Sequence, residues 1–337
     1  MLRSLPVDEW LAFGTPIVDV RSPGEFVRGH IPGAHNLPLF SDEERAVVGT
    51  VYKQQGRDLA VLEGLRIVGP KMAWLVEGAQ RIAPGGGIRV HCWRGGERSG
   101  SVGWLLDKAG FKEVITLRRG YKGFRAHVRT ILSRPFALHV LGGFTGSGKT
   151  GILKHLARLG EQVVDLEALA NHKGSAFGAL GEAPQPTTEH FENLLWSTLD
   201  GMDPARSIWV EDESMMIGRV SIPAMFFATM RSAKLYFAEV PLDERAKRLV
   251  HEYGRFPKED LAEAIYRITK RIGPQNCKAA LAALDEGDLE QVALITLRYY
   301  DKSYLHGASQ RDPQRVIKFP APSNDPEALA RHLIAIA

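Results

Sequence analysis

One cysteine of the sequence stands where nucleophilic chemistry is expected. Cys92 follows a short apolar run and precedes the glycine-containing segment WRGGERSGS. The amides of such a loop can form an anion-binding cup, and the N-terminus of a following helix adds partial positive charge. Arg94 and Arg98 would add two full charges, and this setting favours the reactive thiolate. The pattern predicts a catalytic thiol beside a bound anion; the alternative is a buried, inert cysteine.

A second motif predicts phosphate binding. Residues 143–150 read GFTGSGKT and match the pattern G-x-x-x-x-G-K-[ST] in full. Glycines let the backbone approach phosphate oxygens, the lysine reaches a phosphate, and the threonine hydroxyl binds Mg²⁺. We therefore expect phosphate-binding roles for Gly143, Gly146, Ser147, Gly148, Lys149 and Thr150.

Acidic residues after apolar runs are candidates to complete a Mg²⁺ site. Residues 208–213 read IWVEDE, and Asp165 follows a second apolar pair. An apolar strand that ends in carboxylates can bind Mg²⁺ directly or through water. We predict Thr150, Glu211 and Asp212 as the metal ligands, with Asp165 as a further candidate. The alternative is that these acids are solvated strand ends.

Both motifs need a strand before them and a helix after them, and the neighbouring residues supply both. Residues 88–91 are short, apolar and β-branched, which predicts a buried strand, and residues 101–108 suit the following helix. Residues 136–141 predict the strand before the second motif, and a helix is expected from about residue 149 to residue 160. Further strands are predicted at 114–117, 162–164, 207–210, 234–238 and 316–319. Helical segments are predicted at 242–283 and 289–300, and also up to about residue 82, after a polar connection that begins near residue 57.

This alternation of strands and helices predicts an α/β protein with parallel sheets covered by helices. The chain has 337 residues, which suits two domains. Pro135 interrupts a basic helix, so we place the domains at residues 1–132 and 133–337, the second with a helical C-terminal part.

Composition restricts the class of protein. The hydrophobic fraction is 44%, the charged fraction is 24% and the net charge is +4, which permits a nucleic-acid partner without requiring one. Two cysteines, Cys92 and Cys277, make a disulfide framework unexpected. The N-terminus lacks the apolar core of a signal peptide, and no apolar run has membrane-spanning length. The expected location is the cytoplasm, without a membrane partner.

The residues upstream of Cys92 resemble a known family. Residues 19–26 read DVRSPGEF and residues 29–38 read GHIPGAHNLP, which closely resembles the rhodanese signature over about residues 8–130. The resemblance implies an α/β domain whose Cys92 accepts a chalcogen atom. The spacing from Cys92 to Arg98 is one residue longer than in many rhodaneses and also resembles cysteine-dependent phosphatases. A tetrahedral anion such as selenophosphate would suit this loop.

The second half extends the resemblance to nearly the whole chain. Residues 165–178, 185–187, 211–218 and 299–301, together with the pairing of the two domains, resemble the tRNA 2-selenouridine synthase family. The resemblance implies a transferase acting on tRNA that carries 2-thiouridine at the wobble position. Such an enzyme first geranylates the sulfur with geranyl diphosphate, then replaces the geranylthio group by selenium from selenophosphate, here through Cys92.

Further residues are candidates for substrate contacts. His172 and Lys173 are expected to bind an anion or tRNA, with a polar loop as the alternative. A helical face of basic residues is expected to bind tRNA phosphates, with a solvated face as the alternative: Arg118, Lys122, Arg125 and Arg129. An apolar set is expected to form a prenyl pocket, with plain core as the alternative: Met215, Met216, Ile217, Phe226 and Phe227.

Two rival functions stay open at this point. The first is a rhodanese sulfurtransferase or a cysteine phosphatase fused to an ATP-dependent kinase, which tRNA-independent ATP turnover would favour. The second is a binding module in which Cys92 is inert. This function would be favoured if Cys92 reacted with alkylating agents no faster than a model thiol. The sequence leaves open whether ATP binds residues 143–150, which tRNAs are used, and how many copies of the chain assemble.

Overall fold

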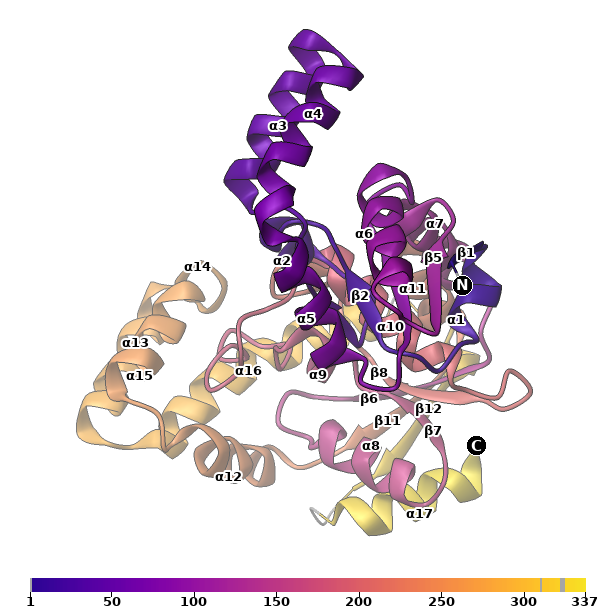
Figure 1. Cartoon of the computed structure of the whole chain (residues 1–337). Coiled ribbons are helices and arrows are strands. Elements are labelled where there is room, and N and C mark those ends of the chain that lie inside the picture. Colours follow the sequence, from indigo (N-terminus) through magenta and orange to yellow (C-terminus); the bar gives the residue numbers. More distant parts are fainter. Residues whose placement is uncertain (1, 310, 322–324) are drawn as a thin grey trace. The chain divides into compact units, whose positions relative to one another are not determined.

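The computed structural model describes residues 2–309, 311–321 and 325–337 (Figure 1). Two compact units divide the chain. Unit 1 comprises Met1–Ile131 with Glu192–Leu194, and unit 2 comprises Leu132–Phe191 with Leu195–Ala337. Within the described residues, no helix combines the length and the hydropathy needed to span a bilayer.

Unit 1 contains a five-stranded sheet in which all neighbouring strands are parallel. In sheet order its strands are β1 (Leu2–Leu5), β5 (Glu113–Leu117), β4 (Gly87–His91), β2 (Ile17–Asp19) and β3 (Ala34–Asn36). The central strand β4 is buried over four of its five residues, Arg89 and His91 included. The sheet therefore places the residue after β4, Cys92, at its carboxyl edge.

Helices of unit 1 alternate with these strands. They are α1 (Val7–Leu11), α2 (Pro23–Arg28), α3 (Asp42–Gln55), α4 (Arg57–Val68), α5 (Met72–Ile82), α6 (Glu97–Lys108) and α7 (Gly120–Leu132). Helix α3 was not expected from the sequence. It begins at a capping box in which Ser41 and Glu44 satisfy each other's backbone amides, and it buries none of its residues. Figure 1 shows α3 and α4 as a helical hairpin that projects from the sheet of unit 1.

Unit 2 is built on a second parallel sheet. In sheet order its strands are β12 (Val316–Pro320), β11 (Lys234–Glu239), β6 (Leu138–Gly143), β8 (Ile208–Glu211) and β7 (Gln162–Val164). A separate antiparallel pair follows β8 and consists of β9 (Met216–Ile217) and β10 (Val220–Ser221). The α/β class with two parallel sheets, predicted from the sequence, is confirmed.

The helices of unit 2 fall into two groups. Those beside the sheet are α8 (Lys149–Arg158), α9 (Leu166–Ala170), α10 (Thr188–Asp200), α11 (Ala224–Ser232) and α17 (Pro326–Ile336). A helical segment between β11 and β12 comprises α12 (Leu242–Tyr253), α13 (Lys258–Arg267), α14 (Thr269–Ile272), α15 (Pro274–Glu286) and α16 (Leu289–Ser309). Figure 1 shows this segment extending away from the sheet of unit 2.

Candidate functional site

Cys92 lies at the start of a tight loop between β4 and α6. Its side chain is 3% exposed, and its sulfur lies 3.2 Å from the hydroxyl of Ser99 in the first turn of α6. Helix α6 begins at Glu97, four residues earlier than the sequence suggested, so its N-terminus faces the loop directly. The loop thus brings the thiol to a helix N-terminus, where the anion-cup prediction placed it, while its burial is the feature that the alternative, a buried cysteine, had in common with it.

Two glycines let the loop pack against the turn after β5. A Cβ added at Gly95 would lie 2.3 Å from the carbonyl of Leu117, and one added at Gly120 would lie 2.3 Å from the carbonyl of Cys92. Both glycines have positive φ. The amide of Tyr121 also donates to the carbonyl of Cys92 (2.8 Å). Side chains at either glycine would therefore force the loop open.

The amides of the loop are available to an anion. Within the described part of the chain, the backbone N–H groups of Arg94, Gly95 and Gly96 donate to no protein acceptor. Arg98 is half-buried and bonds Glu25 (2.7 Å), so its charge is already compensated. Arg94 is exposed. Of the two predicted arginines, Arg98 is anchored by a carboxylate and Arg94 points to solvent.

The second motif forms the expected loop between β6 and α8. Within the described residues, the amides of Gly146, Gly148 and Lys149 have no protein acceptor, which leaves them free for phosphate oxygens. The ammonium of Lys149 donates to the carbonyl of Gly143 (3.2 Å). Ser147 differs from the expectation, because its hydroxyl is buried without a partner and it is not among the residues that line the adjoining pocket.

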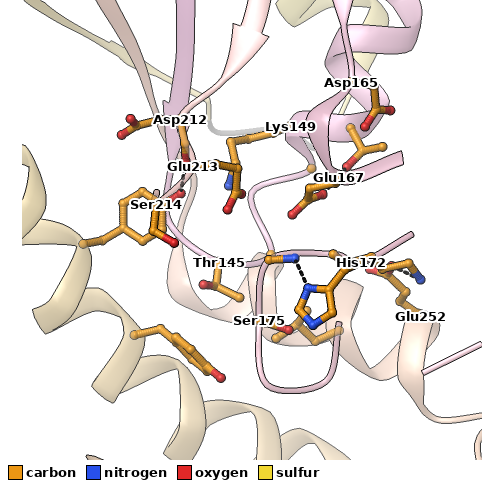
Figure 2. A pocket seen from close by; sticks show the side chains of 18 of the residues that line it. Thr145, Lys149, Asp165, Glu167, His172, Ser175, Asp212, Glu213, Ser214 and Glu252 are labelled. Atoms are coloured by element: carbon orange, nitrogen blue, oxygen red, sulfur yellow. Dashed lines mark hydrogen bonds and ion pairs between the residues drawn. The ribbon is translucent and has the colours of Figure 1, made fainter. Parts of the chain in front are cut away.

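This phosphate loop opens onto a pocket of about 1180 Å³ within unit 2. Figure 2 shows Lys149, Glu167 and Glu213 facing the same space. The lining also includes sequence-predicted residues: Gly146, Gly148, Thr150, Asp165, His172, Lys173 and Asp212. Lys173 is held by Glu252 (2.8 Å) and Glu182 (3.4 Å), so its charge is already paired.

Of the predicted pair of carboxylates, Asp212 lines the pocket and Glu211 does not, and both are already bonded to other groups. Glu211 is 2% exposed and accepts the amide of Glu167 (2.7 Å). Asp212 bonds Arg311 (2.6 Å) and lies 3.7 Å from Arg231. The metal-ligand prediction for Glu211 and Asp212 is therefore not supported, since one is sealed in the fold and the other is already neutralised by arginines.

Glu167 and Glu213, and not the predicted pair, are the carboxylates placed to hold a cation beside Thr150. Glu167 lies 3.3 Å from the hydroxyl of Thr150, and the two glutamates hydrogen-bond each other, which requires a shared proton. Burial, followed by repulsion from Glu167, raises the pKa of Glu213 to about 8. Burial also raises the pKa of Glu167, although Lys149 opposes that shift. A cation at this position would displace the shared proton and join both carboxylates.

This donor set fits Mg²⁺. Within the described residues, no group of three or more His, Cys, Asp or Glu side chains is arranged to hold a metal ion. Mg²⁺ needs no such cage, because it usually takes one or two carboxylates, substrate phosphates and water. Glu167, Glu213 and the hydroxyl of Thr150 meet that requirement beside the phosphate loop, so unit 2 is compatible with Mg²⁺.

Arginines from the helical segment complete the pocket. A Cβ added at Gly148 would lie 1.2 Å from Nη1 of Arg248, so this guanidinium of α12 packs directly on the phosphate loop. Arg271 lines the same pocket from α14. Within the described residues, neither side chain has a carboxylate within ion-pair distance. The sequence gave no local sign of them, because they lie about a hundred or more residues beyond the motif.

The predicted tRNA-binding face is only partly formed. Arg118 precedes helix α7, and Arg125 is buried, paired with Glu192 and bonded to Asn193 (2.6 Å). Lys122 and Arg129 are exposed as expected.

Only part of the predicted prenyl set lines the P-loop pocket. Met215 and Phe227 do so, whereas Ile217 and Phe226 are fully buried core and Met216 is 50% exposed.

Comparison with known families defines the class of protein. A rhodanese-like domain is matched at residues 6–127, and the tRNA 2-selenouridine synthase AAA domain is matched at residues 136–321. The chain is therefore a rhodanese-like α/β domain joined to a P-loop domain, as its two motifs and two parallel sheets indicated.

Relatives are similar along nearly the whole chain. The tRNA 2-selenouridine synthases of Shewanella loihica and a Sulfurovum species are 37% and 35% identical over 345 and 339 residues, covering 90% of this chain in each case and 90% and 91% of those proteins. That of Hydrogenovibrio crunogenus is 36% identical over 324 residues, covering 86% of this chain and 88% of that protein. The chain belongs to the tRNA 2-selenouridine synthase family, which is a family of tRNA-modifying enzymes.

Proposed function

We propose that this chain replaces sulfur by selenium at 2-thiouridine of tRNA in two steps. Unit 2 geranylates the sulfur with geranyl diphosphate, and unit 1 serves the exchange for selenium from selenophosphate through Cys92. The observation that carries the first step is the P-loop pocket of about 1180 Å³, where free amides, Lys149 and Arg248 surround a space larger than a phosphate requires. Because tRNA is the substrate, we assign the activity to the cytoplasm.

In the first step the sulfur of 2-thiouridine attacks C1 of geranyl diphosphate. A C–S bond forms, the C1–O bond breaks, and diphosphate leaves with the electron pair, while the uridine loses its N3 proton to solvent. Negative charge grows on the departing diphosphate, so the loop amides, Lys149 and Arg248 bind the transition state more strongly than the substrate. The donor already carries its leaving group, and the step needs no nucleotide hydrolysis.

Mg²⁺ would add to this charge stabilisation when it is bound. Thr150, Glu167 and Glu213 are the residues that would hold it, with diphosphate oxygens and water in the remaining positions. The two glutamates would then give up their shared proton, and Lys149 would contact the diphosphate.

In the second step the Cys92 thiolate attacks C2 of the geranylated uridine, the bond from C2 to the geranylthio sulfur breaks, and geranylthiol leaves after taking up a proton. Selenium of selenophosphate then attacks C2, a C–Se bond forms, and Cys92 leaves as the thiolate. Water cleaves the Se–P bond and releases phosphate. The unoccupied amides of Arg94, Gly95 and Gly96, with the helix N-terminus at Glu97, support the Cys92 loop as the selenophosphate site. Two chemically different anions thus have two separate loops.

The decisive assay uses purified full-length protein, 2-thiouridine tRNA, geranyl diphosphate and Mg²⁺ without any nucleotide. We expect S-geranylated nucleoside, detected by mass spectrometry, and inhibition by added pyrophosphate. Addition of selenophosphate should then convert that nucleoside to 2-selenouridine.

An absolute requirement for ATP hydrolysis in the first step would overturn this assignment of the P-loop. ATP turnover without tRNA would instead favour a kinase fused to a sulfur-transferring or phosphatase domain. As a control, heat-treated protein with the same substrates should give neither product.

A further inference from the structure

A narrow apolar cavity lies next to the P-loop pocket, in the helical segment of unit 2. Its volume is about 50 Å³. Five residues line both spaces, so the two are direct neighbours: Thr145, Ser175, Leu249, Tyr253 and Tyr300. Thr145 belongs to the phosphate loop itself, so the mouth of the cavity adjoins the place where a diphosphate would bind.

We propose that this cavity binds the far end of the apolar tail of a diphosphate ester whose head group lies on the P-loop, and that it thereby selects tail length. The inference rests on the proposed function for the head group, and it places the tail in a cavity that none of the residues expected from the sequence to form a prenyl pocket lines.

The cavity lies at the junction of two hydrophobic clusters. One cluster contributes Leu261 and Val292 to the walls, with Phe177 packed against it. The other contributes Ala293, with Leu249 packed against it. The two clusters leave a gap where they meet. Because both walls are carbon, the space suits a hydrocarbon rather than a second polar group.

Three hydroxyl groups in the lining, those of Thr296, Tyr300 and Tyr253, already have partners. Thr296 donates to the carbonyls of Val292 and Ala293 (3.0 Å each), and the hydroxyl of Tyr300 accepts the amide of Ala176 (3.0 Å). The hydroxyl of Tyr253 bonds Ser175. Ordered water needs two to four polar partners, so these walls hold water poorly. An apolar chain that enters gains its full transfer free energy without displacing well-bound water.

Size points to a short stretch of chain. One water needs roughly 10–15 Å³ on the same measure, so about 50 Å³ holds roughly four waters, or about one five-carbon isoprenoid unit. The first such unit of a ten-carbon tail would stay in the wide pocket, where its reacting carbon meets the tRNA sulfur. The second unit would fill the cavity, and a third would have no room.

Filling the cavity tests the proposal. Ala293 is 6% exposed and lines the cavity, so Ala293→Leu should occupy much of the space. Ala283 on α15 is 7% exposed, lies in one of the same clusters and lines neither space, so Ala283→Leu is the matched control. The probes are inorganic pyrophosphate and the unreactive geranyl S-thiolodiphosphate, each titrated calorimetrically with Mg²⁺ into the full chain.

We expect the wild type to bind the geranyl analogue at least about a hundredfold more tightly than pyrophosphate, since each buried methylene contributes about fourfold. Ala293→Leu should lower affinity for the geranyl analogue about tenfold or more and change pyrophosphate affinity by less than about twofold. Ala283→Leu should change neither. Equal weakening of both ligands, an equal effect of the control, or no effect of Ala293→Leu would overturn the cavity assignment.

Enlarging the cavity provides an independent measurement. Leu261 forms one wall, and Leu261→Ala should improve binding of the fifteen-carbon analogue relative to the ten-carbon analogue by about fivefold. An unchanged ratio would count against length selection.

The two proposals fail separately. If the wild type geranylates tRNA but Ala293→Leu has no effect on geranyl affinity, the cavity is wrong and the function stands. If the tail-dependent affinity behaves as expected but no geranylated nucleoside forms, the cavity stands and the proposed reaction is wrong.

Discussion

The Cys92 loop and the P-loop share one local plan and differ in access. Each follows a buried parallel strand and precedes a helix, and each leaves backbone amides without protein acceptors. Cys92 is 3% exposed, and the loop is pressed against the turn at Gly120. Lys149 and Thr150 instead line a pocket of about 1180 Å³. The strand–loop–helix unit thus makes an anion site in both cases, and the segments packed over it decide how large a ligand enters.

The largest effect should come from the thiol. Cys92→Ala is expected to lower selenium incorporation at least about a thousandfold while leaving geranylation within about threefold, because only the selenium step uses unit 1. Incorporation is measured by mass spectrometry of nucleosides. Cys277→Ala is the control, since Cys277 is also buried but lies in α15 of unit 2. If folded Cys92→Ala lost both activities equally, the assignment of selenium exchange to unit 1 and geranylation to unit 2 would be wrong.

Lys149→Ala should reverse that pattern. Loss of one group that stabilises the departing diphosphate typically lowers the rate about 100- to 1000-fold, so geranylation should fall by this factor. Selenium exchange on tRNA geranylated beforehand, and alkylation of Cys92 by iodoacetamide, should match the wild type. A parallel fall in the exchange step would show that the two loops do not act separately.

Arg248 gives a finer test of the open pocket. A hydrogen bond to a charged group contributes about 1.5–3 kcal/mol, so Arg248→Ala should weaken pyrophosphate binding roughly tenfold to a hundredfold. Arg248→Lys should recover part of that loss, which a purely structural role on Gly148 would not predict. Calorimetric titration with Mg²⁺ measures both variants, and unchanged affinity in Arg248→Ala would remove this residue from the site.

The two units should respond to pH in opposite directions. Burial lowers the pKa of His91, beside the Cys92 loop, to about 4, whereas burial raises that of Glu213 to about 8. The unfolded chain protonates His91 near pH 6.5, so unit 1 should lose about 2 kcal/mol between pH 7 and pH 5. Unfolded Glu213 loses its proton near pH 4.5, so unit 2 without Mg²⁺ should lose stability as pH rises from 4.5 to 8.

Hydrogen exchange corrected for intrinsic rates follows the two units separately. His91→Gln should reduce the acid loss in unit 1. Glu213→Gln should reduce the alkaline loss in unit 2, to which the raised pKa values of buried Glu167 and Glu211 also contribute. If the stability of both units changed with pH in the same way, the proposed effects of buried His91 in unit 1 and buried Glu213 in unit 2 would be wrong.

The smallest effect concerns tRNA binding by unit 1. The triple variant Arg118→Ala, Lys122→Ala and Arg129→Ala should weaken tRNA binding several-fold and reduce the salt slope by about one per lost phosphate contact. Arg125 is left out because it is buried and paired. The control replaces three exposed basic residues in intrahelical ion pairs: Lys247, Arg267 and Arg331. An unchanged salt slope in the first variant would show that this surface is not used.

Local pattern was enough to predict much of this architecture. Residues 88–91 and 162–164 were expected as strands and correspond to β4 and β7, because each carries β-branched apolar residues in a short run. Helix α3 was missed for the converse reason. It buries no residue, so its sequence lacks the apolar periodicity by which helices are recognised.

The choice among neighbouring acids needed the folded chain. Glu211, Asp212 and Glu213 are consecutive, and sequence alone gave no reason to prefer the third. Arg311, 99 residues further along the chain, neutralises Asp212, and the amide of Glu167 holds Glu211 inside. Only Glu213 is left facing Thr150 with Glu167. Which of the three acids faces the phosphate loop is thus decided by partners far away in the sequence, and these cannot be predicted from the spacing within the motif.

By itself the sequence determined two anion-binding loops, the strands and helices that carry them, and the family to which the chain belongs, since these depend on residues close together in the chain. Tertiary structure alone decided that Cys92 is enclosed, that Arg125 is buried, that Arg248 covers Gly148, and that an apolar cavity opens beside Thr145. Each of these depends on segments tens to hundreds of residues apart, brought together by burial of apolar surface rather than by any local preference of the chain.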